Sequence, residues 1–133
     1  MNQLSNHHFK EIVMPQHILL LINKETEKII SATFAYTPAE VTMITREKED
    51  NKHYIKTFEC DYAMRRNTVT MSNLKPKYIL LLKDWRVVKE HPTNFSSATF
   101  ACTLEEVADM SIEYNSSVYG ITTLACDYTM RGE

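Results

Sequence analysis

The sequence predicts an α+β fold made from a tandem duplication of one strand-strand-helix-strand unit. Two long matches reveal the duplication: "SATFAYTPAEV" from Ser31 recurs as "SATFACTLEEV" from Ser97, and "ECDYAMRR" from Glu59 recurs as "ACDYTMRG" from Ala125. Both matches lie 66 residues apart. Because self-similarity at a fixed spacing is the signature of a repeated structural unit, the two halves are expected to share one fold.

A third match, "PQHILLL" from Pro15 and "PKYILLL" from Pro76, lies only 61 residues apart, so the second half carries five extra residues between its first two strands. A loop accepts such an insertion at little cost. We expect repeats at 14–66 and 75–132 within one domain over 1–133, since a unit below roughly 60 residues buries too little apolar surface alone. The predicted fold has about six mostly antiparallel strands and two helices, related by a pseudo-twofold axis.

The first two strands of each half are read from apolar runs. "HILLLIN" at 17–23 is continuously apolar, which is typical of a strand covered on both faces, and "IISATFAY" at 29–36 is rich in β-branched and aromatic residues. Alternation in the second run places Ile30 on the same face as Ala32 and Phe34. Two helices can cover only one side of a sheet, so the other side needs a second sheet, the N-terminal segment or another subunit. This need predicts a homodimer.

Two capping boxes mark where the helices begin. Thr37 with Glu40, and Thr103 with Glu106, have the spacing at which the threonine accepts from a first-turn amide while the glutamate reaches back. The helices are therefore predicted to begin at Pro38 and Leu104. Their inner faces are expected to contain the following residues: Val41, Ile44 and Thr45 in the first, and Leu104, Val107, Ala108 and Ser111 in the second.

The third strand of each half is predicted to continue through the repeated "CDY" motif. Alternation places Cys60, Tyr62 and Met64 on one face, with Asp61 and Arg65 on the other. Residues 67–74 either extend this strand or turn outward, and residues 1–13 are compatible with a short helix or an added strand. The equivalent residues of the second half are Cys126, Asp127, Tyr128, Met130 and Arg131.

The repeated aspartate and arginine have two interpretations. If the two third strands pair antiparallel, Asp61 faces Arg131 and Arg65 faces Asp127, which makes two cross-strand ion pairs. Alternatively, Arg65 and Arg131 form a clamp for an anionic ligand or an acidic partner, because guanidinium groups present paired donors to phosphate and carboxylate. An enzyme that uses the carboxylates of Asp61 and Asp127 is a third reading, and it requires a pocket.

Trp85 is the single tryptophan and stands beside the inserted loop. It is either a core aromatic or an anchor for a partner protein, since tryptophan is enriched at interface hot spots. The chain has only two glycines, which excludes glycine-rich phosphate cradles and nucleophile elbows. The three cysteines form no CxxC and the five histidines have no zinc-like spacing, so we expect no metal site, no cofactor and reduced, inert thiols.

Charge and hydropathy exclude further classes. A net charge of −2 with both signs interspersed argues against nucleic-acid binding, and no apolar run approaches the ~20 residues of a membrane span. The N-terminus lacks the pattern of a secretory signal, which places the protein in the cytoplasm. The leading prediction is a small non-catalytic interaction or regulatory protein that binds another protein. The alternative is a binder of a small anionic metabolite or nucleotide at the pseudo-twofold axis, with Arg65, Arg131, Asp61, Asp127 and Trp85 as the candidate binding residues.

Overall fold

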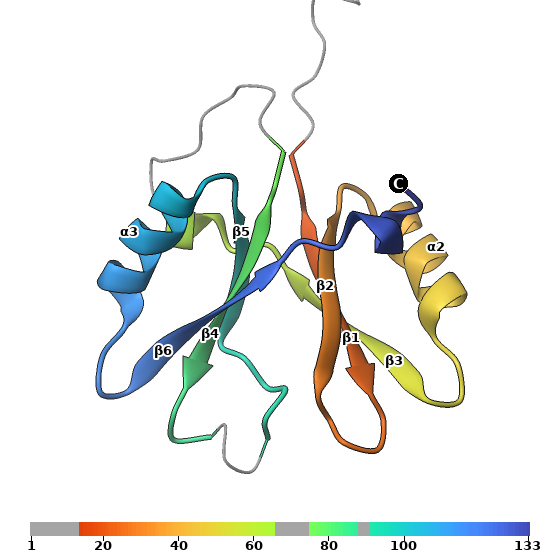
Figure 1. The fold of residues 1–133 in the computed structure, drawn as a ribbon, viewed down its shortest axis with the longest axis horizontal. Coiled ribbons are helices and arrows are strands. Elements are labelled where there is room, and N and C mark those ends of the chain that lie inside the picture. Colours follow the sequence, from red (N-terminus) through yellow and green to blue (C-terminus); the bar gives the residue numbers. More distant parts are fainter. Residues whose placement is uncertain (1–13, 66–74, 88–90) are drawn as a thin grey trace, which may run out of the picture.

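A computed structural model describes residues 14–65, 75–87 and 91–133 of the chain (Figure 1). The predictions for 1–13 and 67–74 lie outside the described residues. Each half contains three strands, one α-helix and a closing 3₁₀ turn. In chain order the elements are β1 (His17–Asn23), β2 (Ile29–Ala35), α2 (Pro38–Lys48), β3 (His53–Glu59), η1 (Tyr62–Arg65), β4 (Tyr78–Asp84), β5 (Ser97–Ala101), α3 (Leu104–Tyr114), β6 (Tyr119–Ala125) and η2 (Tyr128–Arg131).

The strands form two three-stranded antiparallel sheets with equivalent topology. The strand order is β2-β1-β3 in the first sheet and β5-β4-β6 in the second, so the most apolar strand of each half is central. The predicted α+β class and the repeated strand-strand-helix-strand unit are confirmed. None of the helices in the described part of the chain is long and apolar enough to cross a membrane.

The two sheets pack face to face, and each carries one helix on its outer side (Figure 1). In β1, Ile18, Leu20 and Ile22 point into the core between the sheets, while Leu19 packs under α2. The second sheet thus supplies the layer that the apolar run of β1 requires. Because the second sheet covers this face, an uncovered face no longer supports a homodimer, and the homodimer stays a prediction.

An irregularity in β2 changes which isoleucine faces the core. The β1–β2 register shifts between Leu21 and Ile22, so that Ile22 lies opposite Ile29. As a result Ile29 packs against the central core, whereas Ile30 is 52% exposed. The prediction that Ile30 shares the core face of Ala32 and Phe34 is therefore wrong, because strict alternation assumes an unbroken ladder.

The helices begin where the capping boxes predict. The Thr37 hydroxyl accepts from the Glu40 amide at 3.2 Å, and the Thr103 hydroxyl accepts from the Glu106 amide at 3.1 Å. The predicted inner face of α2 is confirmed, with Ile44 buried. In α3 the predicted Val107 does pack against the sheet, and it is joined there by Met110 and Tyr114, which were not predicted. Leu104 is 68% exposed and Ala108 is also exposed, so their prediction as inner residues is wrong.

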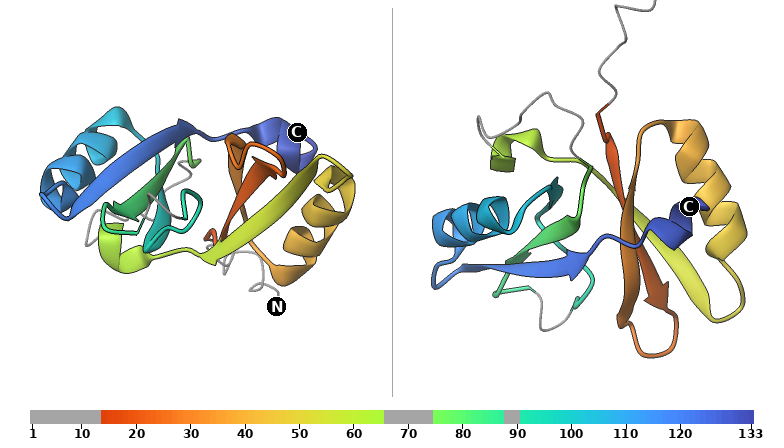
Figure 2. Two further views of the ribbon diagram at one scale, coloured as in Figure 1. Left: turned by 90° about the horizontal axis from the view of Figure 1, so that it is seen from below. Right: turned by 45° about the horizontal axis from the view of Figure 1, so that its top comes forward.

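The third strands end earlier than predicted. β3 stops at Glu59 and β6 at Ala125, and the residues that follow cross to the other half of the molecule (Figure 2). We call residues 60–65 the first arm and residues 126–131 the second arm. Each arm makes one parallel bridge with the opposite sheet, Cys60 with Ala98 and Cys126 with Ala32, and then forms a 3₁₀ turn.

The arms bury their methionines in the opposite half. Met64 of the first arm packs with Leu80, Ala101 and Met110 under α3, and it is 2% exposed. Met130 of the second arm packs equivalently under α2. The two halves therefore complete each other's cores, and neither repeat contains all of its own packing residues.

Candidate functional site

The repeated arginines fasten the arms to the opposite halves. Arg65 lies 4.1 Å over the Phe100 ring, donates to the Phe100 carbonyl, and is 3.1 Å from the Glu106 carboxylate. Arg131 makes the equivalent contacts in the first half, 4.1 Å over the Phe34 ring and 3.2 Å from the Glu40 carboxylate. Its Nε also lies 3.0 Å from the carboxylate of Glu133.

Glu40 and Glu106 each cap a helix and also bind an arginine. Glu106 Oε1 accepts from the Cys102 amide at 2.8 Å and Glu40 Oε1 accepts from the Tyr36 amide at 2.6 Å, which closes the helix N-terminus. The same carboxylates hold the arginines. The side chain of Arg65 is only 2% exposed, so the pair of Arg65 with Glu106 is buried. An unpaired charge in such a buried place is costly.

The predicted cross-strand ion pairs are wrong. Asp61 does not face Arg131, because both residues lie beyond the ends of the third strands and those strands do not pair with each other. Asp61 instead accepts from the Ala63 amide at 3.0 Å, and Asp127 accepts from the Thr129 amide at 2.9 Å, so both begin a 3₁₀ turn. The prediction failed because an Asp-containing turn and a strand end look alike in sequence.

The positions of these arginines and aspartates also bear on the anion-clamp and carboxylate-enzyme interpretations. The arginines lie in opposite halves and each is engaged by a glutamate and a carbonyl, which does not support a shared anion clamp at the axis. Asp61 and Asp127 line two separate clefts and do not form a carboxylate pair. A hydrogen bond from the Thr129 hydroxyl, assisted by Ser31, holds the pKa of the Asp127 carboxyl below its ordinary value despite partial burial.

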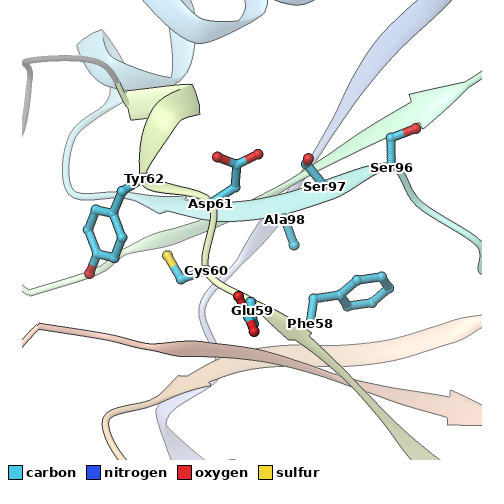
Figure 3. A pocket seen from close by; sticks show the side chains of 8 residues that line it. All are labelled: Phe58, Glu59, Cys60, Asp61, Tyr62, Ser96, Ser97 and Ala98. Atoms are coloured by element: carbon cyan, nitrogen blue, oxygen red, sulfur yellow. The ribbon is translucent and has the colours of Figure 1, made fainter.

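Two clefts of equivalent position lie where the arms leave their strands. The β3–β5 cleft, of about 380 Å³, is lined by residues 58–62 and 96–98 (Figure 3). Figure 3 shows the polar groups of Asp61, Ser96 and Ser97 on one side of it, away from the Cys60 thiol. The β2–β6 cleft, of about 340 Å³, is lined by Ile30, Ser31, Ala32, Leu124, Ala125 and Asp127. These are the positions that a spacing of 66 residues relates to those of the first cleft.

The thiols of Cys60 and Cys126, beside the clefts, are partly buried. Cys60 Sγ lies 3.6 Å from the Thr99 hydroxyl and Cys126 Sγ lies 3.6 Å from the Thr33 hydroxyl. Both threonines are fully buried. Burial raises the pKa of the Cys60 thiol and of the Cys126 thiol to about 11, so both are protonated at neutral pH.

Trp85 is 45% exposed, so the prediction of a core aromatic is wrong. Its ring lies over Gly120 of β6, where a Cβ would come within 2.3 Å of Trp85 Cζ2. Lys83 Nζ sits 4.9 Å from the ring centroid on the same surface. The equivalent of Gly120 in the first half is Tyr54, which packs its own ring on the core. The second half therefore replaces a tyrosine with a glycine that Trp85 covers.

One exposed surface was missed by the sequence reading. On α3, Leu104, Ala108 and Ile112 are spaced by four residues and form a row on the solvent side. Leu104 is 68% and Ile112 is 80% exposed. The signal was present in the sequence, because two apolar rows run along this helix, but periodicity could not tell which of them faces the sheet.

Comparison with protein-family models, with curated proteins and with solved structures finds no match for the chain. Among residues 14–65, 75–87 and 91–133, no three histidine, cysteine, aspartate or glutamate side chains are grouped so that they could hold a metal ion.

Proposed function

We propose that this protein is a small non-catalytic cytoplasmic interaction protein that binds another protein through the outer face of α3. The observation that carries the proposal is the exposed apolar row of Leu104, Ala108 and Ile112, with Leu104 and Ile112 at 68% and 80% exposure. Isolated exposed apolar residues are ordinary, but a row along one helix is typical of a face that docks into a groove.

The duplication supports this assignment, because it offers a comparison within one chain. The positions of α2 equivalent to the row are Pro38, Thr42 and Arg46, so the first half has no such row. Both helices pack on their sheets through other residues. The row is therefore not needed for packing in a fold that both halves share, and its cost in exposed apolar surface points to a use in binding.

The charge beside the row favours a partner over a second copy. Glu105 and Asp109 flank it on one side, and the structure describes no lysine or arginine on α3. In a symmetric dimer through this face the acidic flanks would meet their own copies, and like charges across an interface are unfavourable. The favoured partner presents an apolar groove with basic residues at its rim.

The test is affinity purification from the lysate of the native host with wild-type protein and with the Leu104→Gln, Ile112→Gln double variant. Met43→Gln on α2, where Met43 is 51% exposed, is the matched control. Burying the remaining surface of each side chain is worth about 1–2 kcal/mol, so each substitution should weaken binding about fivefold or more. A partner retained equally by the wild type, the double variant and the control would refute binding through the outer face of α3. Native mass spectrometry of the same eluates separately tests the predicted homodimer.

A further inference from the structure

The arms dock at two equivalent seams, where the third strand of one half meets the second strand of the other half. At the β3–β5 seam, the Asp61 amide donates to the Ala98 carbonyl at 2.8 Å. At the β2–β6 seam, the Asp127 amide donates to the Ala32 carbonyl, also at 2.8 Å. Both seams therefore have the same backbone contact between the halves.

Apolar packing is also present at both seams. Phe95 meets Phe58 edge-on at the β3–β5 seam, with ring centroids 6.2 Å apart. Ile29 and Leu124 hold the equivalent positions at the β2–β6 seam, and both pack against the central core. Apolar side chains therefore fill equivalent positions on the two sides of the molecule.

A lysine joins the two halves at the β3–β5 seam. Lys56 Nζ of β3 donates to the Thr93 carbonyl at 3.0 Å and to Asn94 Oδ1 at 3.2 Å. Lys56 and Asn94 each lie four residues before a member of the bridged pair, Cys60 with Ala98. We call this contact of Lys56 with Thr93 and Asn94 the clasp. It fastens the two chain segments directly before the point at which the first arm docks.

The β2–β6 seam has no equivalent of the clasp. The positions that correspond to Lys56 and Asn94 are Thr122 and Lys28. Within the part of the chain that the structure describes, the side chains of Thr122 and Lys28 form no hydrogen bond or ion pair with each other. A hydrogen bond donated by an ammonium group is stronger than a neutral one. The β3–β5 seam is therefore expected to resist opening more than the β2–β6 seam does.

The arginines of the two arms differ in the same direction. Arg65 and its partner Glu106 are both less exposed than Arg131 and its partner Glu40. Arg131 has a further contact with Glu133, but water screens that carboxylate, which is 45% exposed. The first arm is thus docked more firmly than the second.

The first arm supports α3. Met64 packs under this helix, and Arg65 binds the Glu106 carboxylate. The same carboxylate accepts from the Cys102 amide at the helix N-terminus. The face proposed to bind a partner lies on the solvent side of this helix. A contact that keeps the first arm docked therefore also keeps the docking face in place.

We propose that Lys56 is a positioning residue, whose clasp keeps the first arm and α3 in place while the second arm opens from the first half. Such opening is a local unfolding event that leaves the rest of the chain folded. A surface held in its binding conformation loses less entropy when it binds, so the clasp favours binding through α3. This inference deepens the proposed function and rests on it in one respect, that α3 carries the docking face.

The test is hydrogen exchange of the full-length protein, followed by NMR at the amides of Asp61 and Asp127. Both amides lie in the sequence Cys-Asp-Tyr, so their intrinsic exchange rates are nearly equal. Lys56→Met removes the ammonium group and keeps the aliphatic stem. Lys28→Met is the matched control at the other seam. Asn94→Ala, which removes one acceptor of the clasp, is the second variant if Lys56→Met does not fold.

In the wild type, the Asp127 amide should exchange at least tenfold faster than the Asp61 amide. Lys56→Met should speed exchange at Asp61 at least tenfold and leave Asp127 within about twofold, since loss of a charged hydrogen bond is enough for such a change. It should also speed exchange of the Cys102 amide at the start of α3. Asn94→Ala should act in the same direction, and Lys28→Met should change none of these rates.

Two results would overturn the inference. One is equal exchange at Asp61 and Asp127 in the wild type, because the seams would then open alike. The other is equal acceleration at both amides in Lys56→Met, because the lysine would then stabilise the whole fold and position no single arm. The rates are measured without a partner, so a failure of docking through α3 would appear only in the affinity purification.

Discussion

Replacing Glu106 with glutamine isolates the charge that holds the first arm. A glutamine carbonyl still accepts from the Cys102 amide, so the helix cap survives while the carboxylate 3.1 Å from Arg65 is lost. The side chains of Arg65 and Glu106 are 2% and 12% exposed. Removing one partner of such a buried pair costs about 3–5 kcal/mol, because the other charge keeps its desolvation penalty.

The duplicated chain supplies the comparison. Glu40→Gln is the same substitution at the equivalent position, but Glu40 is 29% exposed, so water partly screens its charge. A partly exposed pair is worth about 1 kcal/mol. We therefore expect Glu106→Gln to lower the free energy of unfolding by about 2 kcal/mol more than Glu40→Gln does, which corresponds to about 6–10 °C in midpoint temperature for a chain of this size.

Urea denaturation followed by circular dichroism measures both values, with the unfolding slope as the check on two-state behaviour. Glu105→Gln, on the solvent side of the same helix, controls for the loss of one negative charge and should change stability by less than about 0.5 kcal/mol. The reasoning fails if Glu106→Gln is no more destabilising than Glu40→Gln. It also fails if Arg65→Met combined with Glu106→Gln shows no coupling energy in a double-mutant cycle.

Two further predictions concern the thiols and the tryptophan. Burial raises the pKa values of Cys60 and Cys126 from 9.0 to about 11. Between these pH values the unfolded state releases the thiol protons while the folded state keeps them. The free energy of unfolding should therefore be constant in this respect below pH 9, and between pH 9 and 11 it should fall by up to about 1.4 kcal/mol per pH unit for each thiol. Urea denaturation at several pH values in this range should show that the free energy of unfolding falls less steeply for the Cys60→Ala, Cys126→Ala double variant than for the wild type. An equal fall in both proteins would contradict the raised thiol pKa values. Gly120→Ala puts a methyl group where the ring of Trp85 lies, so it should displace the ring, shift tryptophan fluorescence to the red and cost about 1–2 kcal/mol. Thr123→Ala on the same strand should leave the spectrum unchanged, and an unshifted spectrum for Gly120→Ala would disprove this contact.

The candidate binding surfaces could be predicted only in part. Asp61 and Asp127 were selected as candidates, and both line clefts, but as turn-capping residues at positions that depend on the arms. Trp85 was selected as a candidate anchor, and its exposure depends on the absence of a side chain at Gly120. The outer row of α3 was not identified. Whether a side chain or an amide is covered depends on elements distant in sequence.

By itself the sequence determined the repeated unit, the strands that begin at His17 and Tyr78, and the helix starts at Pro38 and Leu104. These features follow from local physics: apolar runs favour strands, and capping boxes satisfy the first amides of a helix. Only the tertiary structure decided that Arg65 pairs with Glu106 and Arg131 with Glu40. Two identical motifs can pack within their own half or on the opposite one, and local propensity is the same in both cases. The choice is made by burial of Met64 and Met130 under the opposite helices, which is a long-range contact that no short stretch of sequence encodes.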